Sequence, residues 1–520
     1  MSDSTITFLI LGAVVIVFVW DRLPVAVVAL GVALSLWATG VLDLDQALGG
    51  FGDPTVIFIA SLFVVSEGLD STGITTWAGQ ELIARAGDSR TRLIVLMMLL
   101  VAVLTALISV NGAVAALVPV VAVMAVRLHM SPSQILMPLA FGAHAGSLLA
   151  LTGSPVNVIV SEYADDAGVG RFGFFEFALV GIPLLAGTIA IVVLFGERLL
   201  PTRKPRAMKR DFGDFARTLV DQYALDDDPD TLVSRQSGVA EVVVPPRSLL
   251  IGETVFPGMV TESGDLVVLA VQRKGEERSG ETELAVGDTL LLQGSWGALE
   301  YHLDDPDVLV VDDPALVRRQ AVPLGPGAKQ TLVILVGMVI LLATGAVPPA
   351  VAGLLAAGAI VLTGVLTVDE AYRGIAWTTV ILVGGMIPLS TAMVQTGAAN
   401  TLADGLVDVV GDSGPHALLL GLVLLTLALG QLISNMATAL IVIPIAVSAA
   451  SELDVSAKPV LMAVCVASSA AFLTPVATPA NLMVMGPGGY RFGDYWKLGL
   501  PLLILFAVVA VLLVPLIWSF

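Results

Sequence analysis

The sequence predicts an α-helical polytopic membrane protein made of two related halves, with a small soluble domain inserted between them. Of the 520 residues, 56% are hydrophobic and 13% are charged, and apolar runs of about 20 residues recur along most of the chain. Residues 207–322 are different, because they hold 22 of the 44 acidic residues and 10 basic ones. We therefore expect this segment to be solvated and the rest to lie in a membrane.

Composition also excludes several classes of protein. The net charge of −19 argues against a nucleic-acid partner. The single cysteine, Cys465, excludes an intramolecular disulfide and a cysteine-based metal cluster. Residues 1–5 contain no basic residue, so the first apolar run is not expected to be a cleaved signal peptide. The membrane halves contain no paired carboxylates, nucleotide loop or nucleophile motif, so we expect no catalytic residue and no enzyme.

An internal duplication organises the two halves. Residues of the first half match residues 324 positions later, and the offset becomes 325 at one polar break. A repeat of this kind predicts that both halves fold in the same way. The matching pairs include Gly40 and Gly364, Asp45 and Asp369, Pro155 and Pro479, Asn157 and Asn481, and, at the polar break, Ser109 and Ser434.

Each half is expected to contain five spanning helices, a re-entrant hairpin and a broken helix. In the first half the expected segments are 5–20, 23–39, 54–69, an amphipathic piece at 73–86, hairpin arms at 91–108 and 113–127, a broken helix at 133–163, and 174–195. In the second half they are 330–346, 348–366, 377–394, an amphipathic piece at 398–410, hairpin arms at 416–431 and 439–450, a broken helix from 457 onward, and 495–518.

The hairpins are predicted from polar residues inside apolar runs. Ser434, Asn435 and Met436 interrupt one such run, and Ser109, Val110 and Asn111 interrupt the other. Polar groups are costly in hydrocarbon without partners, and non-helical backbone at membrane depth persists only inside protein or beside a wet cavity. A hairpin with its tip inside the protein meets this requirement. The alternative is a spanning helix whose Ser and Thr side chains bond to their own turn.

The charged loops predict the topology. Five crossings per half make the second half inverted relative to the first, as in many secondary transporters. With both termini external and the insert cytoplasmic, at the plasma membrane, basic residues fall inside almost throughout, with Arg171 and Lys458 as exceptions. The basic residues expected inside are Arg22, Arg85, Arg90, Arg92, Arg127, Arg198, Arg203, Lys204, Arg206, Lys329, Arg373, Arg491 and Lys497.

Four domains follow from this organisation. Residues 1–200 form the first membrane repeat, 201–230 a linker, 231–313 a cytoplasmic module and 325–520 the second repeat. Short alternating runs at 240–244, 266–271 and 289–293, separated by Gly and Pro, predict strands of a small α/β module.

The tips and turns resemble those of the divalent-anion/sodium symporter family. That resemblance rests on the two tips and on the turns Ser154-Pro155-Val156-Asn157 and Thr478-Pro479-Ala480-Asn481, and it covers both halves. The tips depart from the family's Ser-Asn-Thr pattern at Val110, Asn111 and Met436, which leaves the identity of the anion open. The insert is similar to the C-terminal module of regulators of potassium conductance (RCK), on residues 241–246 and 287–294.

The repeats and the resemblance imply a secondary transporter that works by alternating access. The substrate would be a divalent oxyanion, sulfate or a dicarboxylate, with Na+ as coupling ion and no other cofactor. The expected partners are the lipid bilayer, a second copy in a homodimer and an unknown small ligand of the module. An ion channel or an anion sensor controlled by the module is the alternative.

Specific residues are expected to form the site, because broken helices offer free carbonyls and positive helix ends. His144 could carry a proton, although a packed, neutral histidine is the plainer interpretation. The first cation site would comprise Ser109, Asn111, Gly153 and Asn157, and the second Ser434, Asn435, Ala437 and Asn481. The anion would lie between the tips, Ser109, Val110, Asn111, Ser434, Asn435 and Met436, and against Ser154 and Thr478.

Overall fold

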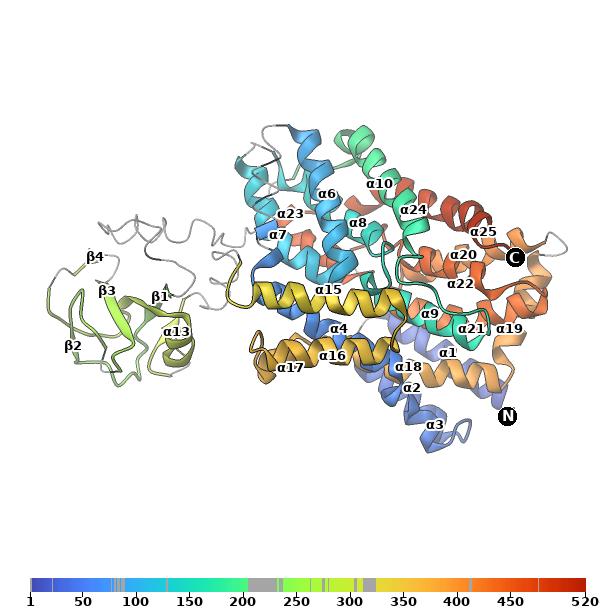
Figure 1. The fold of residues 1–520 in the computed structure, drawn as a ribbon, viewed down its shortest axis with the longest axis horizontal. Coiled ribbons are helices and arrows are strands. Elements are labelled where there is room, and N and C mark those ends of the chain that lie inside the picture. The colour runs from blue at the N-terminus through green and yellow to red at the C-terminus, as the bar shows by residue number, and fades with distance from the viewer. Residues whose placement is uncertain are drawn as a thin grey trace. The chain divides into compact units, whose positions relative to one another are not determined.

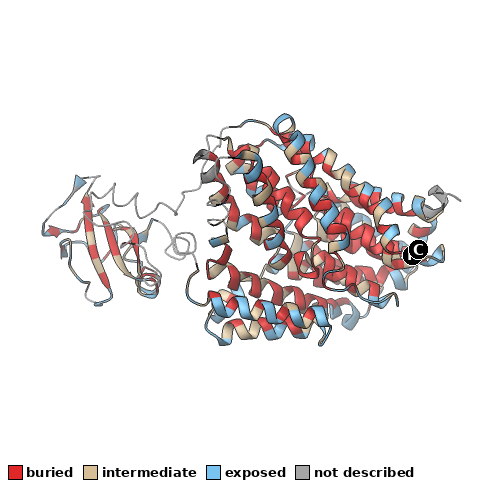
Figure 2. Ribbon diagram, turned by 45° about the horizontal axis from the view of Figure 1, so that its top comes forward, coloured by how far each residue is buried: buried red, intermediate tan, exposed pale blue. Residues whose placement is uncertain are grey.

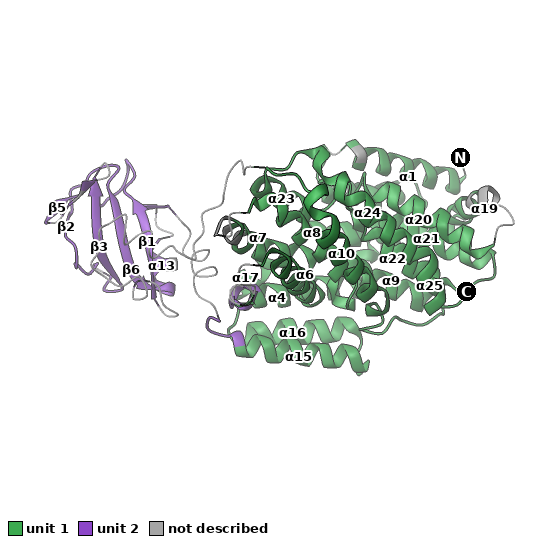
Figure 3. Ribbon diagram, turned by 90° about the horizontal axis from the view of Figure 1, so that it is seen from above, with its two compact units in different colours: residues 1–69, 78–209, 329–520 green, residues 70–77, 210–328 purple. Residues whose placement is uncertain are grey.

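The computed structural model divides the chain into two compact units (Figure 3). The first comprises Met1–Leu69, Ala78–Lys209 and Lys329–Phe520, and the second comprises Asp70–Trp77 and Arg210–Ala328. The structure describes residues 2–20, 22–75, 77–78, 81, 85, 89–127, 130–203, 232, 237–261, 263–273, 276–278, 280–303, 306–311, 324–410, 414–475 and 477–520.

The described part of the first unit is helical (Figure 1). The first half contains α1 (Asp3–Trp20), α2 (Val25–Ala38), α3 (Leu44–Gly49), α4 (Pro54–Ser71), α6 (Arg90–Leu107), α7 (Val110–Arg127), α8 (Leu136–Gly146), α9 (Pro155–Asp166) and α10 (Ala178–Leu199). The second contains α15 (Ala328–Thr344), α16 (Pro349–Leu362), α17 (Val368–Gly374), α18 (Trp377–Gln395), α19 (Ala398–Val410), α20 (Pro415–Gly430), α21 (Asn435–Glu452), α22 (Ala457–Ser468), α23 (Pro479–Gly488), α24 (Tyr495–Val508) and α25 (Val514–Ile517).

The helical unit has the apolar surface of a membrane protein. Six helical segments are long and apolar enough to cross a bilayer, and six shorter helices of the described chain are also apolar. Large apolar side chains remain exposed on the outer helices, such as Leu362 at 88% and Leu516 at 82%. Figure 2 shows buried residues through the middle of this unit and exposed ones along its outer helices. The prediction of a mostly helical, multi-pass membrane protein is confirmed.

Two short helices, α3 and α17, were missed in the sequence analysis. Each begins with a capping box, in which the first residue's side chain accepts a backbone N–H and a side chain three residues later reaches back. Asp43 and Gln46 form the box of α3, and Thr367 and Glu370 form that of α17. These residues are again 324 positions apart, so the duplication extends to the local capping.

The expected hairpin arms are helices that pack against each other, α6 on α7 and α20 on α21. The chain leaves the helical conformation between the arms at Ser109 and at Leu432–Ser434, where the polar breaks were predicted. Helix α6 and helix α21 are each 18 residues long and qualify as spans by length. Length therefore does not distinguish a re-entrant hairpin from two spans, and re-entry stays a prediction.

The first segment of each broken helix ends earlier than predicted from the sequence. Helix α8 ends at Gly146 and helix α9 begins at Pro155, although the expected turn began at Ser154. In the second half α22 ends at Ser468 and α23 begins at Pro479, although the expected turn began at Thr478. The residues just after each helix are small or apolar, so local sequence carried no stop signal.

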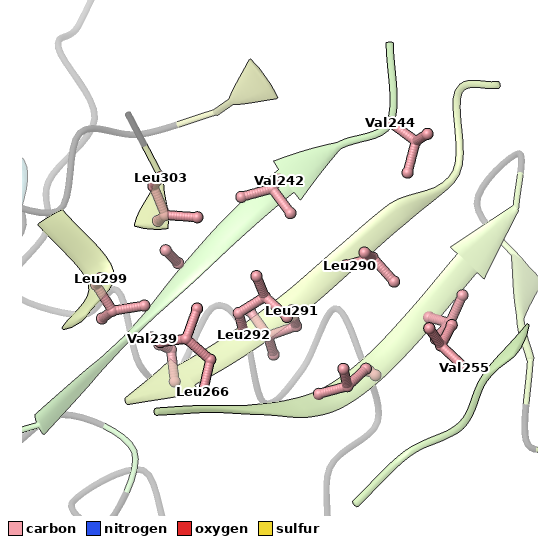
Figure 4. Packing of buried hydrophobic residues seen from close by; sticks show 14 of the residues in the cluster. Val239, Val242, Val244, Val255, Leu266, Leu290, Leu291, Leu292, Leu299 and Leu303 are labelled. Atoms are coloured by element: carbon pink, nitrogen blue, oxygen red, sulfur yellow. The ribbon is translucent and has the colours of Figure 1, made fainter. Parts of the chain in front are cut away.

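Between residues 237 and 311 the described part of the second unit is an antiparallel β-structure with one short helix, α13 (Trp296–His302). Buried residues from the central strands form its core (Figure 4), and the Arg273 guanidinium binds the buried Asp288 carboxylate at 2.7 Å. The predicted α/β module is thus a predominantly antiparallel β-sheet. A five-stranded sheet has the order β4 (Glu276–Glu277), β3 (Leu266–Arg273), β6 (Thr289–Ser295), β1 (Ser237–Val243), β7 (Leu309–Val310), and β2 (Thr254–Val255) pairs with β5 (Thr282–Glu283).

Candidate solute site

The two helix breaks are held by the same bonds in both halves. The Asn157 amide donates to the carbonyls of Ser147, at 2.7 Å, and Ala150, at 2.9 Å. The Asn481 amide donates to Ala471, at 2.7 Å, and Thr474, at 3.1 Å. Each of these six residues matches its counterpart at the offset of 324. Both asparagines are fully buried, and each satisfies carbonyls that the helix break leaves without helical partners.

The second half-helices begin with side-chain caps. The Ser154 hydroxyl accepts the N–H of Val156 at 3.2 Å, and the Thr478 hydroxyl accepts the N–H of Asn481 at 3.3 Å. A proline follows each cap, where its missing N–H costs no hydrogen bond. The N-termini of α9 and α23, which are the positive ends of their helix dipoles, therefore lie at these two turns.

A helix near the end of each half packs directly on the break. A side chain at Gly181 of α10 would overlap the carbonyl of Leu148, and one at Gly499 of α24 would overlap the carbonyl of Phe472. Leu148 and Phe472 are another pair at the offset of 324. Only glycine allows this approach, so the two breaks are fixed by the same packing as well as by the same bonds.

Each hairpin tip is joined to the break of its own half. The Thr152 hydroxyl donates to the carbonyl of Ala106 at 2.6 Å in the first half. In the second half the Gln431 side chain donates to Ala470 at 3.0 Å and accepts from the N–H of Leu473 at 2.9 Å. Tip and break are therefore one structure in each half, although different side chains make the connection.

At the tips, serines cap the second arms. The Ser109 hydroxyl accepts the N–H of Gly112 at 3.2 Å, and the Ser434 hydroxyl accepts the N–H of Ala437 at 3.3 Å. The Asn435 Oδ1 atom is buried and has no hydrogen-bond partner among the described residues. An oxygen of this kind is costly unless a ligand satisfies it.

A cavity of about 240 Å³ lies among these elements. Among the described residues that line it, none is Asp, Glu, Lys or Arg. Thr378 and Thr379 of α18, and Ser147 and Ser469 at the breaks, were missed because nothing in the sequence places them near the tips. The predicted site residues that line the cavity are Ser109, Val110, Asn111, His144, Gly153, Ser154, Ser434, Asn435, Met436 and Thr478.

Three predicted ligands, Asn157, Ala437 and Asn481, are fully buried and are not among the cavity-lining residues. Asn157 and Asn481 are each also contacted by a side chain of the opposite half. The Cys465 thiol donates to Asn157 Oδ1 at 3.2 Å, and His144 Nε2 lies 3.3 Å from Asn481 Oδ1 and 3.2 Å from Thr478 Oγ1. Side chains of both halves therefore meet at the site.

A larger cavity, of about 450 Å³, has a different chemistry. Asp53, Glu162 and Asp166 line it, and Tyr163 donates to the Ser390 hydroxyl at 2.6 Å. Three carboxylates disfavour an anionic solute because like charges repel. The smaller, uncharged cavity is the better candidate for an anion.

Comparisons with known proteins agree with this architecture. A family model described as a citrate transporter (CitMHS) matches residues 15–467 and 410–520. The uncharacterized transporter YfbS of Escherichia coli is 30% identical, over 98% of both chains. The probable sodium/sulfate cotransporter 3 of Chlamydomonas reinhardtii is 27% identical over 56% of this chain and 33% of its own.

The solved structure of the Alcanivorax borkumensis YdaH transporter is 16% identical, with a TM-score of 0.46, and covers 97% of this chain and 99% of its own. The family model and the full-length relative carry the assignment. The chain belongs to the citrate transporter (CitMHS) family of membrane proteins, and it is a secondary transporter and not an enzyme.

Proposed function

We propose that the protein is a Na+-coupled transporter of a small divalent oxyanion, sulfate or a dicarboxylate, that works by alternating access. The observation that carries the proposal is the cavity at the tips and turns of both halves. Its described lining offers hydroxyls, amides and helix starts and contains no charged side chain. Relatives named as sodium/sulfate cotransporters support both the anion class and the coupling ion.

The anion would be held by neutral donors alone. Backbone N–H groups at the start of a helix bind oxyanions, and the cavity lies at the starts of α7, α9, α21 and α23. Ser154 and Thr478 would add hydroxyls, and Ser109, Val110, Asn111, Ser434, Asn435 and Met436 the two tips. Because no cationic side chain is fixed in the cavity, the charge of a bound Na+ would offset the charge of the bound anion. Each would therefore favour binding of the other, which couples the two.

The cation sites would lie beside the tips. Ser109, Asn111, Gly153 and Asn157 would form the first, and Ser434, Asn435, Ala437 and Asn481 the second. The unpartnered Asn435 Oδ1 supports the second site, since a cation would satisfy it. Asn157 and Asn481 each have one donor on Oδ1 already, and a carbonyl oxygen keeps a second lone pair for a cation.

The halves would be inverted repeats, each with five spans, a re-entrant hairpin and a broken helix. The identical bonds at the two breaks support a common origin. Both termini lie at the same end of the helical unit (Figures 1 and 3), which fits two external termini. In this topology the tips approach from opposite sides of the membrane and meet at the cavity.

The inserted unit would be a cytoplasmic, RCK-like regulatory module at residues 231–313, following a linker at 201–230. The expected homodimer and the module's small ligand remain predictions of the same kind. The two membrane repeats, 1–200 and 325–520, would contain all of the transport pathway, because they align with each other without the module.

Uptake into proteoliposomes tests the proposal and separates it from its rivals. We expect accumulation of radiolabelled sulfate or succinate above the outside concentration under an inward Na+ gradient, and loss of accumulation when the gradient is dissipated. A channel would equilibrate the anion without concentrating it, and a sensor would bind it without uptake. The variant Asn435→Ala is expected to lose Na+ dependence while inserting normally. Wild-type uptake in Asn435→Ala would contradict the assigned cation site.

A further inference from the structure

Among the described residues of the candidate site, only His144 bonds from the first half into the capped turn of the second. It lies on α8, is 2% exposed, and its Nε2 atom is within hydrogen-bond distance of Thr478 and Asn481. A buried histidine at a transport site suggests a proton carrier. The hydrogen-bond directions around it indicate another role.

The orientation of the Asn481 side chain is fixed first. Its Nδ2 atom lies 2.7 Å and 3.1 Å from two carbonyl oxygens, those of Ala471 and Thr474. A carbonyl accepts and never donates, so the nitrogen must occupy this position and Oδ1 must face His144.

The tautomer of His144 follows from that orientation. An unprotonated Nε2 would set its lone pair against the lone pair of Asn481 Oδ1 at 3.3 Å. Nε2 must therefore carry a hydrogen in the neutral imidazole, and it shares this hydrogen with the Thr478 hydroxyl oxygen at 3.2 Å.

The direction of the Thr478 hydroxyl comes last. Its oxygen already accepts from the N–H of Asn481, and it accepts from His144 as well. With both lone pairs used, its own hydrogen is left to donate, and Thr478 lines the cavity. A hydroxyl that can only donate there selects a ligand with acceptor oxygens, as in an oxyanion.

The capped turn of the first half, at Ser154, has no equivalent imidazole among the described residues of the second half. The position matching His144 is Ser468, whose hydroxyl is buried without a partner among the described residues. Asn157 Oδ1 accepts from the Cys465 thiol, a weak donor, and the Ser154 hydroxyl oxygen accepts only from the N–H of Val156 in the described chain. The two sides of the cavity are therefore unequal, with a fixed hydroxyl donor on the Thr478 side.

We propose that His144 is a positioning residue for anion binding: its neutral Nε2–H orients Thr478 so that the hydroxyl donates to the solute. The inference rests on the proposed function only in that the cavity binds an anion. It requires no proton on or off His144 during transport. The ring of His144 contacts Thr478, Asn481 and Phe472, and no described residue that lines the cavity is charged.

A double-mutant cycle tests the inference through the KM for sulfate uptake. We expect His144→Leu and Thr478→Val each to raise the KM about tenfold, the effect of one neutral hydrogen bond, with a smaller change in maximal rate. The KM of the double variant should also be about tenfold above that of the wild type, because His144 acts through Thr478. His144→Gln keeps an N–H donor that does not titrate and should stay within about threefold of wild type at every pH. Ser468→Ala, the matched control, should be unchanged.

Three results would overturn the inference. His144→Gln as impaired as His144→Leu, with the pH dependence of wild-type uptake abolished, would make His144 a proton carrier. A KM about a hundredfold above wild type in the double variant would show that the two residues act independently. A wild-type KM in His144→Leu would remove any role. If His144→Leu does not reach the membrane, His144→Gln decides by its KM and pH profile. If wild type accumulates succinate or citrate and not sulfate, the sulfate assignment fails, and the cycle is measured with the accumulated anion.

Discussion

Removing the Asn157 side chain should open the first helix break and leave the second closed. In Asn157→Ala the carbonyl of Ser147 loses its hydrogen-bond donor at 2.7 Å, and that of Ala150 keeps only the N–H of Gly153. A buried carbonyl without a donor costs about 1–3 kcal/mol, and the loss of one of two bonds costs about 1 kcal/mol. The local free energy of opening should therefore fall by about 2–4 kcal/mol.

Hydrogen–deuterium exchange measures this opening directly. Since 1.4 kcal/mol is a factor of ten, exchange of the amides at 147–157 should rise at least about 25-fold. The corresponding amides at 471–481 should keep wild-type rates, and Asn481→Ala should give the reverse pattern. Asn435→Ala is the matched control, because its Oδ1 has no hydrogen-bond partner among the described residues, and it should leave both segments unchanged. A rise of less than threefold at 147–157, or an equal rise at 471–481, would refute this account of the breaks.

Three further predictions concern topology and the inserted module. In intact cells a cysteine placed at Ser2 should react with an impermeant maleimide and one placed at exposed Ser263 should not; labelling at Ser263 would rule out a cytoplasmic insert. The hydrogen bond from the Arg273 guanidinium lowers the pKa of Asp288 below its ordinary 3.8, so this pair stabilises the module above that pH and the stabilisation is lost as pH falls through the lowered pKa. Protection of the backbone amides at 266–295 from hydrogen exchange should therefore fall on acidification in the wild type. In Arg273→Gln this acid-induced fall should be absent, and a fall equal to that of the wild type would contradict the prediction. The net charge of −12 at 207–322 predicts that protection of the module rises between roughly 0.1 and 2 M KCl as repulsion is screened, and a flat response would argue against such repulsion.

The internal duplication predicted more of the structure than local sequence patterns did. It paired Asn157 with Asn481 before any contact was known, and these two make the same pair of bonds to their own breaks. It also pairs the capping boxes of α3 and α17, which a search for apolar runs alone overlooks. A repeated pattern carries information because both copies must satisfy the same buried groups.

Contacts between distant segments could not be predicted in this way. The helices stop at Gly146 and Ser468, before the next proline in each half, because buried asparagines bind the released carbonyls. Glycines of α10 and α24 let those helices pack on the breaks. The approach of His144 to Asn481 and of Cys465 to Asn157 breaks the symmetry of the repeat, so no alignment of the halves indicates it. The threonines of α18 join the cavity through packing alone.

Equilibrium binding of radiolabelled sulfate to the purified protein tests the central claim, that an oxyanion and Na+ share the cavity between the tips. Because linkage is reciprocal, sulfate should bind more tightly as Na+ replaces K+ at constant ionic strength, and Na+ should bind more tightly by the same factor when sulfate is present. Asn435→Ala should abolish this coupling while the protein stays folded. Sulfate affinity that is the same in Na+ and K+, or coupling that survives in Asn435→Ala, would contradict the account.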